Sequence, residues 1–338
     1  MKNAHGGDTY GREEMLDFSA NINPLGMPES VRKAAADALG RCGGYPDPHC
    51  RMLVKKLAEH EGFDEANIVC GNGAADLIYR MIHAIKPKRA VITKPTFSEY
   101  AKALGEAGCK ITECPTDAVE GAVTAKTDMV VMCSPNNPTG QLADKHTLEK
   151  LSGKCSDNNI ILLCDECFID LCEAPGKHSV RNYMNGNVII LKAFTKTYAM
   201  AGLRLGYALF GSPELADKVR ETGQFWSVSA VAQAGGIAAL DETEYVEKAR
   251  RTIAEERRFL FDSLSRSGFT VYPSDANFIL FKCGYPLDEL LENEGFIIRN
   301  CGNYSGLGKG YFRIAVRLHK ENEALMNAIE KVIKWQKT

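Results

Sequence analysis

Short apolar runs alternate with amphipathic segments along the first two thirds of the chain. The apolar runs are residues 68–70, 90–92, 129–133, 160–164, 188–191 and 205–210. Runs of this length predict buried strands. Segments with the 3.6-residue spacing of a helix separate most of them, at residues 77–85, 97–107 and 146–158, and another follows the last run at residues 214–222. Strands that alternate with helices predict an α/β fold with a mainly parallel sheet.

The two ends of the chain have a different pattern. The first 27 residues are irregular, and Pro28 then opens a helical segment that runs to Leu39, followed by another over residues 51–61. A long helical pattern covers residues 231–267. Short strands at residues 270–272, 278–281, 296–298 and 312–316 then alternate with helices, the last over residues 322–336. We predict a large domain over residues 30–230 and a smaller α+β domain from residues 1–29 and 231–338.

Composition narrows the class of protein. The 338 residues are 45% hydrophobic and 25% charged, as in an ordinary globular protein. A formal net charge of -2 gives no reason to expect nucleic acid or an anionic membrane as a partner. No apolar run approaches the roughly 20 residues that span a bilayer, and residues 1–8 lack a signal-peptide core. We therefore expect a cytoplasmic protein.

The 12 cysteines raise the question of a metal or redox site. Cys164 and Cys167 form a CxxC, with Cys172 five residues further on. Cys164 ends an apolar run, where cysteine behaves as a small buried hydrophobe. No second CxxC and no histidine pair completes a zinc set. We expect reduced structural thiols and no metal; a redox-sensitive thiol or an unrecognised metal site is the alternative.

Candidate chemistry begins where the run 188–191 ends. Lys196 follows that run beside the hydroxyl of Thr195, and Arg204 lies eight residues on between glycines and leucines. Desolvation lowers the pKa of a buried lysine, so that its amine can attack a carbonyl. An arginine nearby can clamp a phosphate with two parallel hydrogen bonds. An aldehyde and a phosphate on one small molecule describe pyridoxal phosphate. The alternative is an ordinary solvated surface lysine.

Other polar landmarks also follow strands, where an α/β sheet binds its ligands. Gly73-Ala74-Ala75 opens a helix whose free N–H groups can receive a phosphate. Phe97 can stack on a flat ring, or be a core residue. Asp165 can accept a hydrogen bond from a protonated pyridine nitrogen, and its burial requires a cationic partner. Asn137 can donate to a ring oxygen or a carboxylate, or be a turn residue between prolines.

Taken in order, these motifs resemble fold-type I pyridoxal-phosphate enzymes of the aminotransferase class I/II family. The motifs are Gly-Ala-Ala, Pro-Thr-Phe, Pro-Asn-Asn-Pro-Thr-Gly, Asp-Glu-x-Phe, Phe-Thr-Lys and Gly-Leu-Arg-Leu-Gly, and they cover nearly the whole chain. The resemblance implies a large domain with a mainly parallel seven-stranded sheet and a smaller α+β domain. It also implies the following roles: Lys196 attaches the cofactor, Asp165 pairs with the pyridine nitrogen, Asn137 contacts the ring oxygen, Phe97 stacks on the ring, and Gly73, Ala74, Ala75, Thr195 and Arg204 hold the phosphate.

Two further implications concern the second subunit and a departure from the pattern. A tyrosine at the position of Tyr45 reaches the phosphate from the neighbouring subunit in this family, so a homodimer is implied. Ala193 stands where the family usually has a serine or threonine, which removes one hydroxyl contact to the phosphate.

The chain ends carry the expectation about the substrate. His5-Gly6-Gly7-Asp8 with the stretch 16–26, and the segments 298–304 and 311–317, are similar to those of family members that decarboxylate O-phospho-L-threonine in cobalamin biosynthesis. This similarity implies that Arg313 and Asn137 bind the substrate carboxylate, and that Arg299, His5, Gly6 and Asn21 bind its phosphate. The alternatives are an aminotransferase for histidinol phosphate, a decarboxylase for O-phospho-L-serine, and a cofactor-binding protein without activity.

Overall fold

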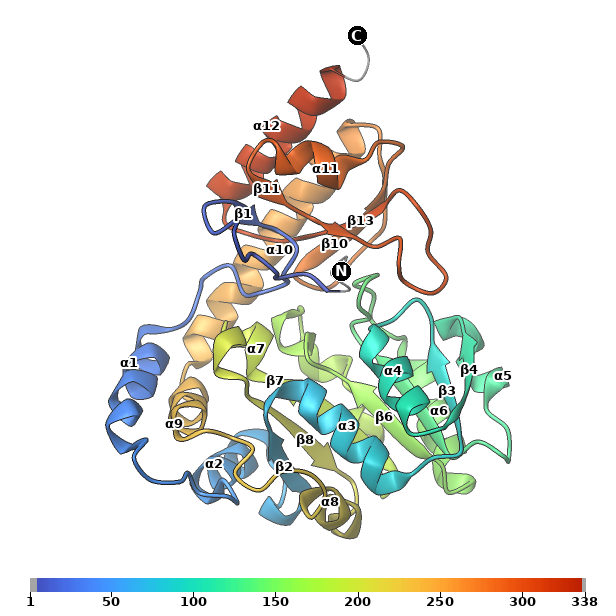
Figure 1. Ribbon diagram of the computed structural model, residues 1–338. Helices are drawn as coiled ribbons and strands as arrows, with labels where there is room; N and C mark the ends of the chain where they lie inside the picture. The colour runs from blue at the N-terminus through green and yellow to red at the C-terminus, as the bar shows by residue number, and fades with distance from the viewer. Residues whose placement is uncertain (1–4, 336–338) are drawn as a thin grey trace.

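The structure is a computed structural model that describes residues 5–335 (Figure 1). Seven strands form the larger sheet in the order β2-β8-β7-β6-β5-β3-β4. They are β2 (Ile68–Gly71), β3 (Arg89–Thr93), β4 (Lys110–Cys114), β5 (Met129–Cys133), β6 (Ile161–Asp165), β7 (Val188–Ala193) and β8 (Gly206–Phe210). The predicted α/β fold with a mainly parallel seven-stranded sheet is confirmed.

One strand runs against the others. The strands β7, β6, β5, β3 and β4 run parallel to one another, whereas β8 is antiparallel to both β7 and β2. The amino end of β8 therefore lies at the same edge of the sheet as the carboxyl ends of the six other strands. This geometry brings Arg204, just before β8, to the edge where the other predicted site residues emerge.

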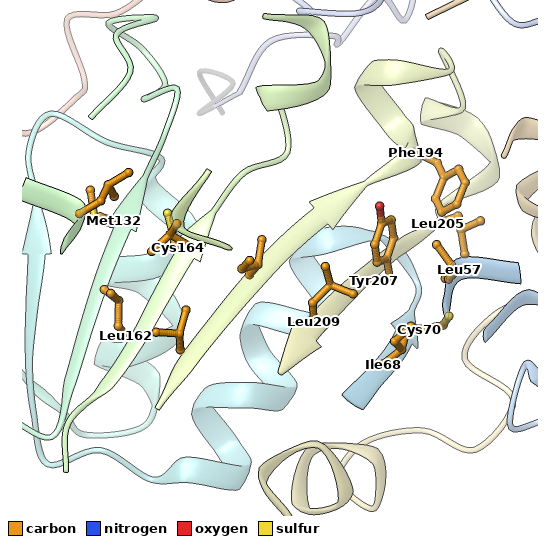
Figure 2. Close-up of a cluster of buried hydrophobic side chains, with 14 of the residues drawn as sticks. Leu57, Ile68, Cys70, Met132, Leu162, Cys164, Phe194, Leu205, Tyr207 and Leu209 are labelled. Atoms are coloured by element: carbon orange, nitrogen blue, oxygen red, sulfur yellow. The ribbon is translucent and has the colours of Figure 1, made fainter. Parts of the chain in front are cut away.

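Helices cover both faces of this sheet. One apolar cluster joins a face to α2 (Arg51–Glu61), α6 (Lys145–Asp157) and α9 (Ala230–Ala239), and Figure 2 shows part of it, including Phe194, Leu205 and Tyr207. The other face packs on α3 (Gly73–Ile85), α4 (Ser98–Glu106) and α8 (Pro213–Arg220). With both faces buried, the inner strands β5, β6 and β7 are largely apolar, as the continuous runs predict.

A smaller, antiparallel sheet has the order β12-β13-β10-β9. Its strands are β9 (Thr270–Val271), β10 (Phe278–Lys282), β12 (Arg299–Asn300) and β13 (Tyr311–Ala315), and it packs with α10 (Thr243–Arg266), α11 (Leu287–Glu292) and α12 (His319–Trp335). In Figure 1, α10 runs from beside α9 up to this sheet. Gln336, predicted to end the last helix, lies outside the described residues. The predicted division into domains stays a prediction.

The N-terminal segment is tied to the smaller sheet. The strand β1 (Leu16–Asp17) pairs in parallel with β11 (Phe296–Ile297), and the Ala315 N–H donates to the Phe18 carbonyl at 2.8 Å. Figure 1 shows the dark blue segment passing between the smaller sheet and the larger one. Residues 5–21 are thereby placed next to the strands that carry Arg299 and Arg313.

Some elements differ from the prediction. The helical pattern over residues 231–267 is two helices, α9 and α10; at the break between them Asp241 pairs with Lys56 and Glu242 with Ser30. The edge strand β4 was not predicted, since most of its side chains are exposed and polar. In the part of the chain that the structure describes, no helix has the length and apolarity to cross a membrane.

The helix α1 (Glu29–Ala38) begins one residue after Pro28, close to the predicted start. It packs against α9, and its Val31 belongs to the same apolar cluster as α2 and α9. Since residues 230–239 pack here, they cover the larger sheet and not the smaller one.

Candidate active site

Lys196 lies in a single helical turn, α7 (Phe194–Thr197), directly after β7. The sequence predicts this lysine just past the end of a buried strand, and the structure places it there. Its ammonium is 5.6 Å from the centre of the Phe168 ring. Burial, together with the positive charges of Arg313 and Arg204, lowers the pKa of Lys196 to about 8. An appreciable fraction of the amine is therefore neutral near physiological pH, as a nucleophile requires.

Asn23 fixes the backbone of this turn. Its side-chain amide donates to the Thr197 carbonyl at 2.8 Å, and its backbone N–H donates to the Lys196 carbonyl at 3.2 Å. Asn23 is itself buried. The N-terminal segment therefore holds the lysine-bearing turn of the larger sheet from outside.

Asp165 closes β6 and is buried. Its Oδ2 accepts a hydrogen bond from the Tyr100 hydroxyl at 2.6 Å, and its Oδ1 accepts from the Cys167 N–H at 2.9 Å. Burial is the largest influence and raises the pKa of Asp165, while these two donors and the charge of Lys196 oppose the rise. The expected cationic partner is thus Lys196, acting as a nearby charge; the direct donors to Asp165 are neutral groups.

Three strands bring together a cradle for a phosphate. Gly71, Gly206 and Ala193 stand side by side in the register of β2, β8 and β7. Three of the predicted phosphate ligands, Gly73, Arg204 and Thr195, each lie two residues from this row, beyond the edge of the sheet. The helix α3 begins at Gly73, so the N–H groups of its first turn, including those of Ala74 and Ala75, also face this edge.

Gly73 is required by the closeness of this packing. It has a positive φ of 80°, and a Cβ added to it would lie 2.6 Å from the Arg204 Nη2. Similarly, a Cβ on Gly206 would lie 2.7 Å from the Ala74 N. Only glycine leaves room for the guanidinium to reach the helix start. An arginine beside free backbone N–H groups is an anion-binding arrangement.

The residues at this edge fit pyridoxal phosphate. They offer an amine of lowered pKa, a buried carboxylate and a phosphate cradle, and Phe97 stands at the start of α4 with its ring partly exposed. Within residues 5–335, the buried Thr197 Oγ1 and Asn21 Oδ1 have no hydrogen-bond partner. Such atoms are costly unless a ligand or water meets them.

Arg299 and Arg313 come together from the smaller sheet. Both are buried, and their Cα atoms are paired across β12 and β13. Arg313 donates to the Asn137 Oδ1, and its Nη2 donates to the Ser19 carbonyl at 2.8 Å. Arg299 donates to the Asn303 Oδ1 at 2.8 Å. Asn137, beyond β5, is thereby joined directly to Arg313; that the two bind one carboxylate stays a prediction.

His5 and Gly6 lie at a cavity next to the smaller sheet, whereas Asn21 is buried. His5 and Gly6 line the same cavity as Arg299, of about 1170 Å³. The imidazole Nε2 of His5 lies 2.9 Å from Glu99 Oε1 on α4, and the centre of the His5 ring is 5.5 Å from that of the Phe97 ring. Gly6 passes so close to Ser19 that a Cβ would lie 2.2 Å from its carbonyl oxygen. His5 thus borders the Arg299 cavity while hydrogen-bonded to Glu99.

Tyr45 is on the surface. Its side chain is 81% exposed and stacks on Trp226, with ring centres 4.4 Å apart. Trp226 in turn meets Phe225 edge to face at 4.8 Å. The predicted contact of Tyr45 with a phosphate needs a second subunit and stays a prediction.

Membership of a family follows from the whole chain. A family model described as aminotransferase class I and II matches residues 13–332. The chain belongs to this family. Enzymes of the family depend on pyridoxal phosphate, and this is the cofactor that the edge of the sheet fits. The resemblance predicted from the motifs is confirmed.

Relatives within the family include both predicted activities. The chain is 35% identical to the threonine-phosphate decarboxylase of Salmonella typhimurium, over 98% of this chain and 97% of that protein. It is 31% identical to histidinol-phosphate aminotransferase 1 of Cupriavidus pinatubonensis, over 96% and 90%. The crystal structure of the histidinol-phosphate aminotransferase from Clostridium acetobutylicum superposes with a TM-score of 0.87 at 28% identity, covering 94% of this chain and 99% of that one.

Sequence reasoning missed several residues that complete the site. Tyr100 lies three residues after Phe97 on α4, Asn23 lies two residues after Asn21, and Tyr304 lies in the loop after β12. Each belongs to a stretch already singled out by its motif. Their partners, however, are 65 residues or more away in the chain, so no local spacing reveals them.

Proposed function

We propose that this chain is a pyridoxal-phosphate-dependent decarboxylase that converts O-phospho-L-threonine to (R)-1-amino-2-propanol phosphate, a precursor in cobalamin biosynthesis. The observation that carries the proposal is the pair of buried arginines, Arg299 and Arg313, on one face of the smaller sheet. Two guanidinium groups suit a substrate with two anionic groups. The similarity to the Salmonella typhimurium decarboxylase over nearly the whole length of both chains supports the same reading.

In this proposal the larger sheet holds the cofactor. Lys196 would attach it through its amine, and Asp165 would accept a hydrogen bond from the pyridine nitrogen. Phe97 would cover the ring, and Asn137 would reach its oxygen. The phosphate would be held by Gly73, Ala74, Ala75, Thr195 and Arg204, with Tyr45 added by a second subunit. When bound, pyridoxal phosphate delocalises the electron pair left at Cα after one of its bonds breaks.

The smaller sheet and the N-terminal segment would then orient the substrate. Arg313 and Asn137 bind the carboxylate, while Arg299, with His5, Gly6 and Asn21, binds the phosphate. The bond from Cα to the carboxylate carbon breaks, carbon dioxide leaves, and a proton is added to Cα. The Lys196 amine would return that proton. Its lowered pKa lets it exchange protons near neutral pH.

Histidinol-phosphate aminotransferase is the second candidate. It is favoured by the 31% identity to the Cupriavidus pinatubonensis enzyme, because the two reactions share the cofactor and a substrate phosphate. Decarboxylation of O-phospho-L-serine is a variant of the first proposal, since the two substrates differ by one methyl group, which is worth only about 1–3 kcal/mol of discrimination. A homodimer and a cytoplasmic location belong to the same proposal.

Incubation of the cofactor-loaded protein with O-phospho-L-threonine tests the proposal. We expect stoichiometric release of carbon dioxide and formation of an amino alcohol phosphate, with turnover. Accumulation of pyridoxamine phosphate without carbon dioxide, or turnover of histidinol phosphate with 2-oxoglutarate, would favour the aminotransferase. If the protein gained no yellow absorbance with the cofactor, or kept that absorbance after borohydride treatment, it would not be an enzyme of this class.

A further inference from the structure

The loop over residues 301–310 leaves the smaller sheet and reaches the larger one. It connects β12 to β13. Its Ser305 hydroxyl donates to Glu113 Oε2 on β4 at 2.6 Å, and its Tyr304 hydroxyl lies 3.3 Å from Asn137 Oδ1 beyond β5. The loop therefore joins the two sheets at the edge where cofactor and substrate would meet.

Tyr304 contacts both arginines of the smaller sheet through different parts of its side chain. The centre of its ring is 5.5 Å from the Arg299 Cζ, within the range of a cation–π contact. Its hydroxyl oxygen is 3.5 Å from the Arg313 Nη1. The ring thus contacts Arg299, whereas the hydroxyl contacts Arg313 and Asn137.

The hydroxyl also determines which way Asn137 points. The Asn137 Oδ1 accepts from Arg313 Nη1 and from Tyr304, which uses both lone pairs of the amide oxygen. With its oxygen held in this way, the amide must present its NH₂ group elsewhere. Its two donors are then left for a ring oxygen or a carboxylate, the two acceptors that Asn137 was expected to bind.

We propose that Tyr304 is a positioning residue with two separable parts. Its hydroxyl orients Asn137 and Arg313 toward the substrate carboxylate, and its ring supports Arg299 toward the substrate phosphate. The proposal rests on the proposed function only in that Arg313 and Arg299 receive those two groups. Tyr304 itself touches neither reacting atom; it acts through the residues that do.

Two substitutions separate the two parts in the cofactor-loaded protein. Tyr304→Phe removes the hydroxyl and keeps the ring, whereas Tyr304→Leu removes both. The probes are O-phospho-L-threonine, which has a carboxylate and a phosphate, and 1-amino-2-propanol phosphate, which lacks the carboxylate. The change in cofactor absorbance with concentration gives the half-saturating concentration of each probe, and kcat is followed separately by carbon dioxide release.

Tyr304→Phe should raise the half-saturating concentration of O-phospho-L-threonine about five- to twentyfold, the usual loss for one or two hydrogen bonds. The same substitution should change the half-saturating concentration of 1-amino-2-propanol phosphate less than twofold. Tyr304→Leu should weaken the binding of both probes. The matched control is Tyr311→Phe, which removes a hydroxyl from β13 that pairs with Tyr272, 3.3 Å away, and should affect neither probe.

The inference is wrong if the Tyr304→Phe protein binds both probes as tightly as the unaltered protein does, or if the substitution weakens the binding of both probes equally. Should Tyr304→Leu fail to fold, the comparison of the two probes in Tyr304→Phe still decides. Failure of the proposed function looks different. The unaltered protein would then bind O-phospho-L-threonine without releasing carbon dioxide, and the ratio between the two probes could still be measured in every variant.

Discussion

Arg299 and Arg313 are paired directly across the antiparallel strands β12 and β13, so both side chains emerge on one face of the smaller sheet. Like charges in this position destabilise a sheet. Arg313 is surrounded by the neutral oxygens of Asn137 and Ser19. Two guanidinium groups on one face suit a substrate with two negative groups, which is why we propose that the substrate binds at this face.

Substitution of each arginine should distinguish the group that binds the substrate phosphate from the group that binds its carboxylate. Arg299→Gln should lower kcat/KM for O-phospho-L-threonine at least about 30-fold, because it removes a buried charge partner of the phosphate. Any residual decarboxylation of L-threonine, which has no phosphate, should be much less affected. Arg313→Gln should impair both substrates. Steady-state kinetics with the two amino acids checks this, with exposed Arg258→Gln on α10 as the control. Equal losses on both substrates for Arg299→Gln would contradict the assignment of Arg299 to the phosphate.

The second prediction concerns Lys196 in the cofactor-free protein. Burial lowers its pKa from 10.5 to about 8. Between these two values the unfolded chain binds more protons than the folded one, so the contribution of Lys196 to the free energy of unfolding rises with pH from 8 to 10.5. Lys196→Met removes this rise. At pH 7 the cofactor-free variant should be more stable than the unaltered protein by up to roughly 3 kcal/mol.

Urea unfolding of both cofactor-free proteins from pH 7 to 10.5 measures the difference. Burial raises the pKa of several tyrosines and cysteines in the folded protein, so these groups also make stability depend on pH in this range, but they are common to both proteins and cancel in the comparison. A constant difference in stability across the pH range would mean that Lys196 is not held in a charge-disfavouring site. Lys196→Met should also abolish borohydride fixation of the cofactor, which a surface lysine would not.

The third prediction concerns Tyr100. Its hydroxyl donates to the buried Asp165 at 2.6 Å and so favours the ionised carboxylate against the effect of burial. Tyr100→Phe should raise the pKa of Asp165 further and make it a poorer acceptor for a protonated pyridine nitrogen. We expect cofactor affinity to fall about tenfold, the loss for one hydrogen bond to a charged group. Equilibrium dialysis measures it, with Tyr245→Phe as the control. An unchanged dissociation constant would rule out this role of Tyr100.

Residues at the ends of apolar strands were the most predictable part of the site. Gly73, Asp165 and Lys196 each follow a continuous apolar run, and parallel strands bring their carboxyl ends to one edge whatever their order. Arg204 was predicted from its motif, although its position depends on β8 being antiparallel, which no local pattern reveals. The structure places Arg204 beside Gly73 at that edge, a position that the hydrophobic pattern alone does not specify; its contact with a phosphate stays a prediction.

Residues whose role depends on a distant partner were not predictable. Tyr100 reads as a core aromatic on α4, and only its contact with Asp165 gives it a further role. Tyr304 reads as a loop residue, and its contacts with Asn137 and Arg299 exist because the loop crosses between the two sheets. The break between α9 and α10 was not predictable either, since no glycine or proline marks it in the sequence.

The last prediction tests whether a second subunit completes the site. Tyr45, Trp226 and Phe225 form an exposed aromatic cluster, with Tyr45 81% and Phe225 61% exposed. Exposed aromatic clusters mark interaction surfaces. We expect a dimer in sedimentation experiments, with Tyr45 acting in the site of the partner. Tyr45→Ala and Lys196→Ala should each be nearly inactive alone, the first through loss of a phosphate contact.

Mixing these two inactive variants distinguishes a shared site from a self-contained one. In a mixed dimer, one site combines Lys196 of the Tyr45→Ala chain with Tyr45 of the Lys196→Ala chain and is therefore intact. Reversible unfolding and refolding of an equimolar mixture should restore about a quarter of the activity of the unaltered protein, since half of the dimers are mixed and each has one intact site. If Tyr45 served the site of its own chain, no site in the mixture would be intact. Activity would then stay at the level of the two variants measured separately.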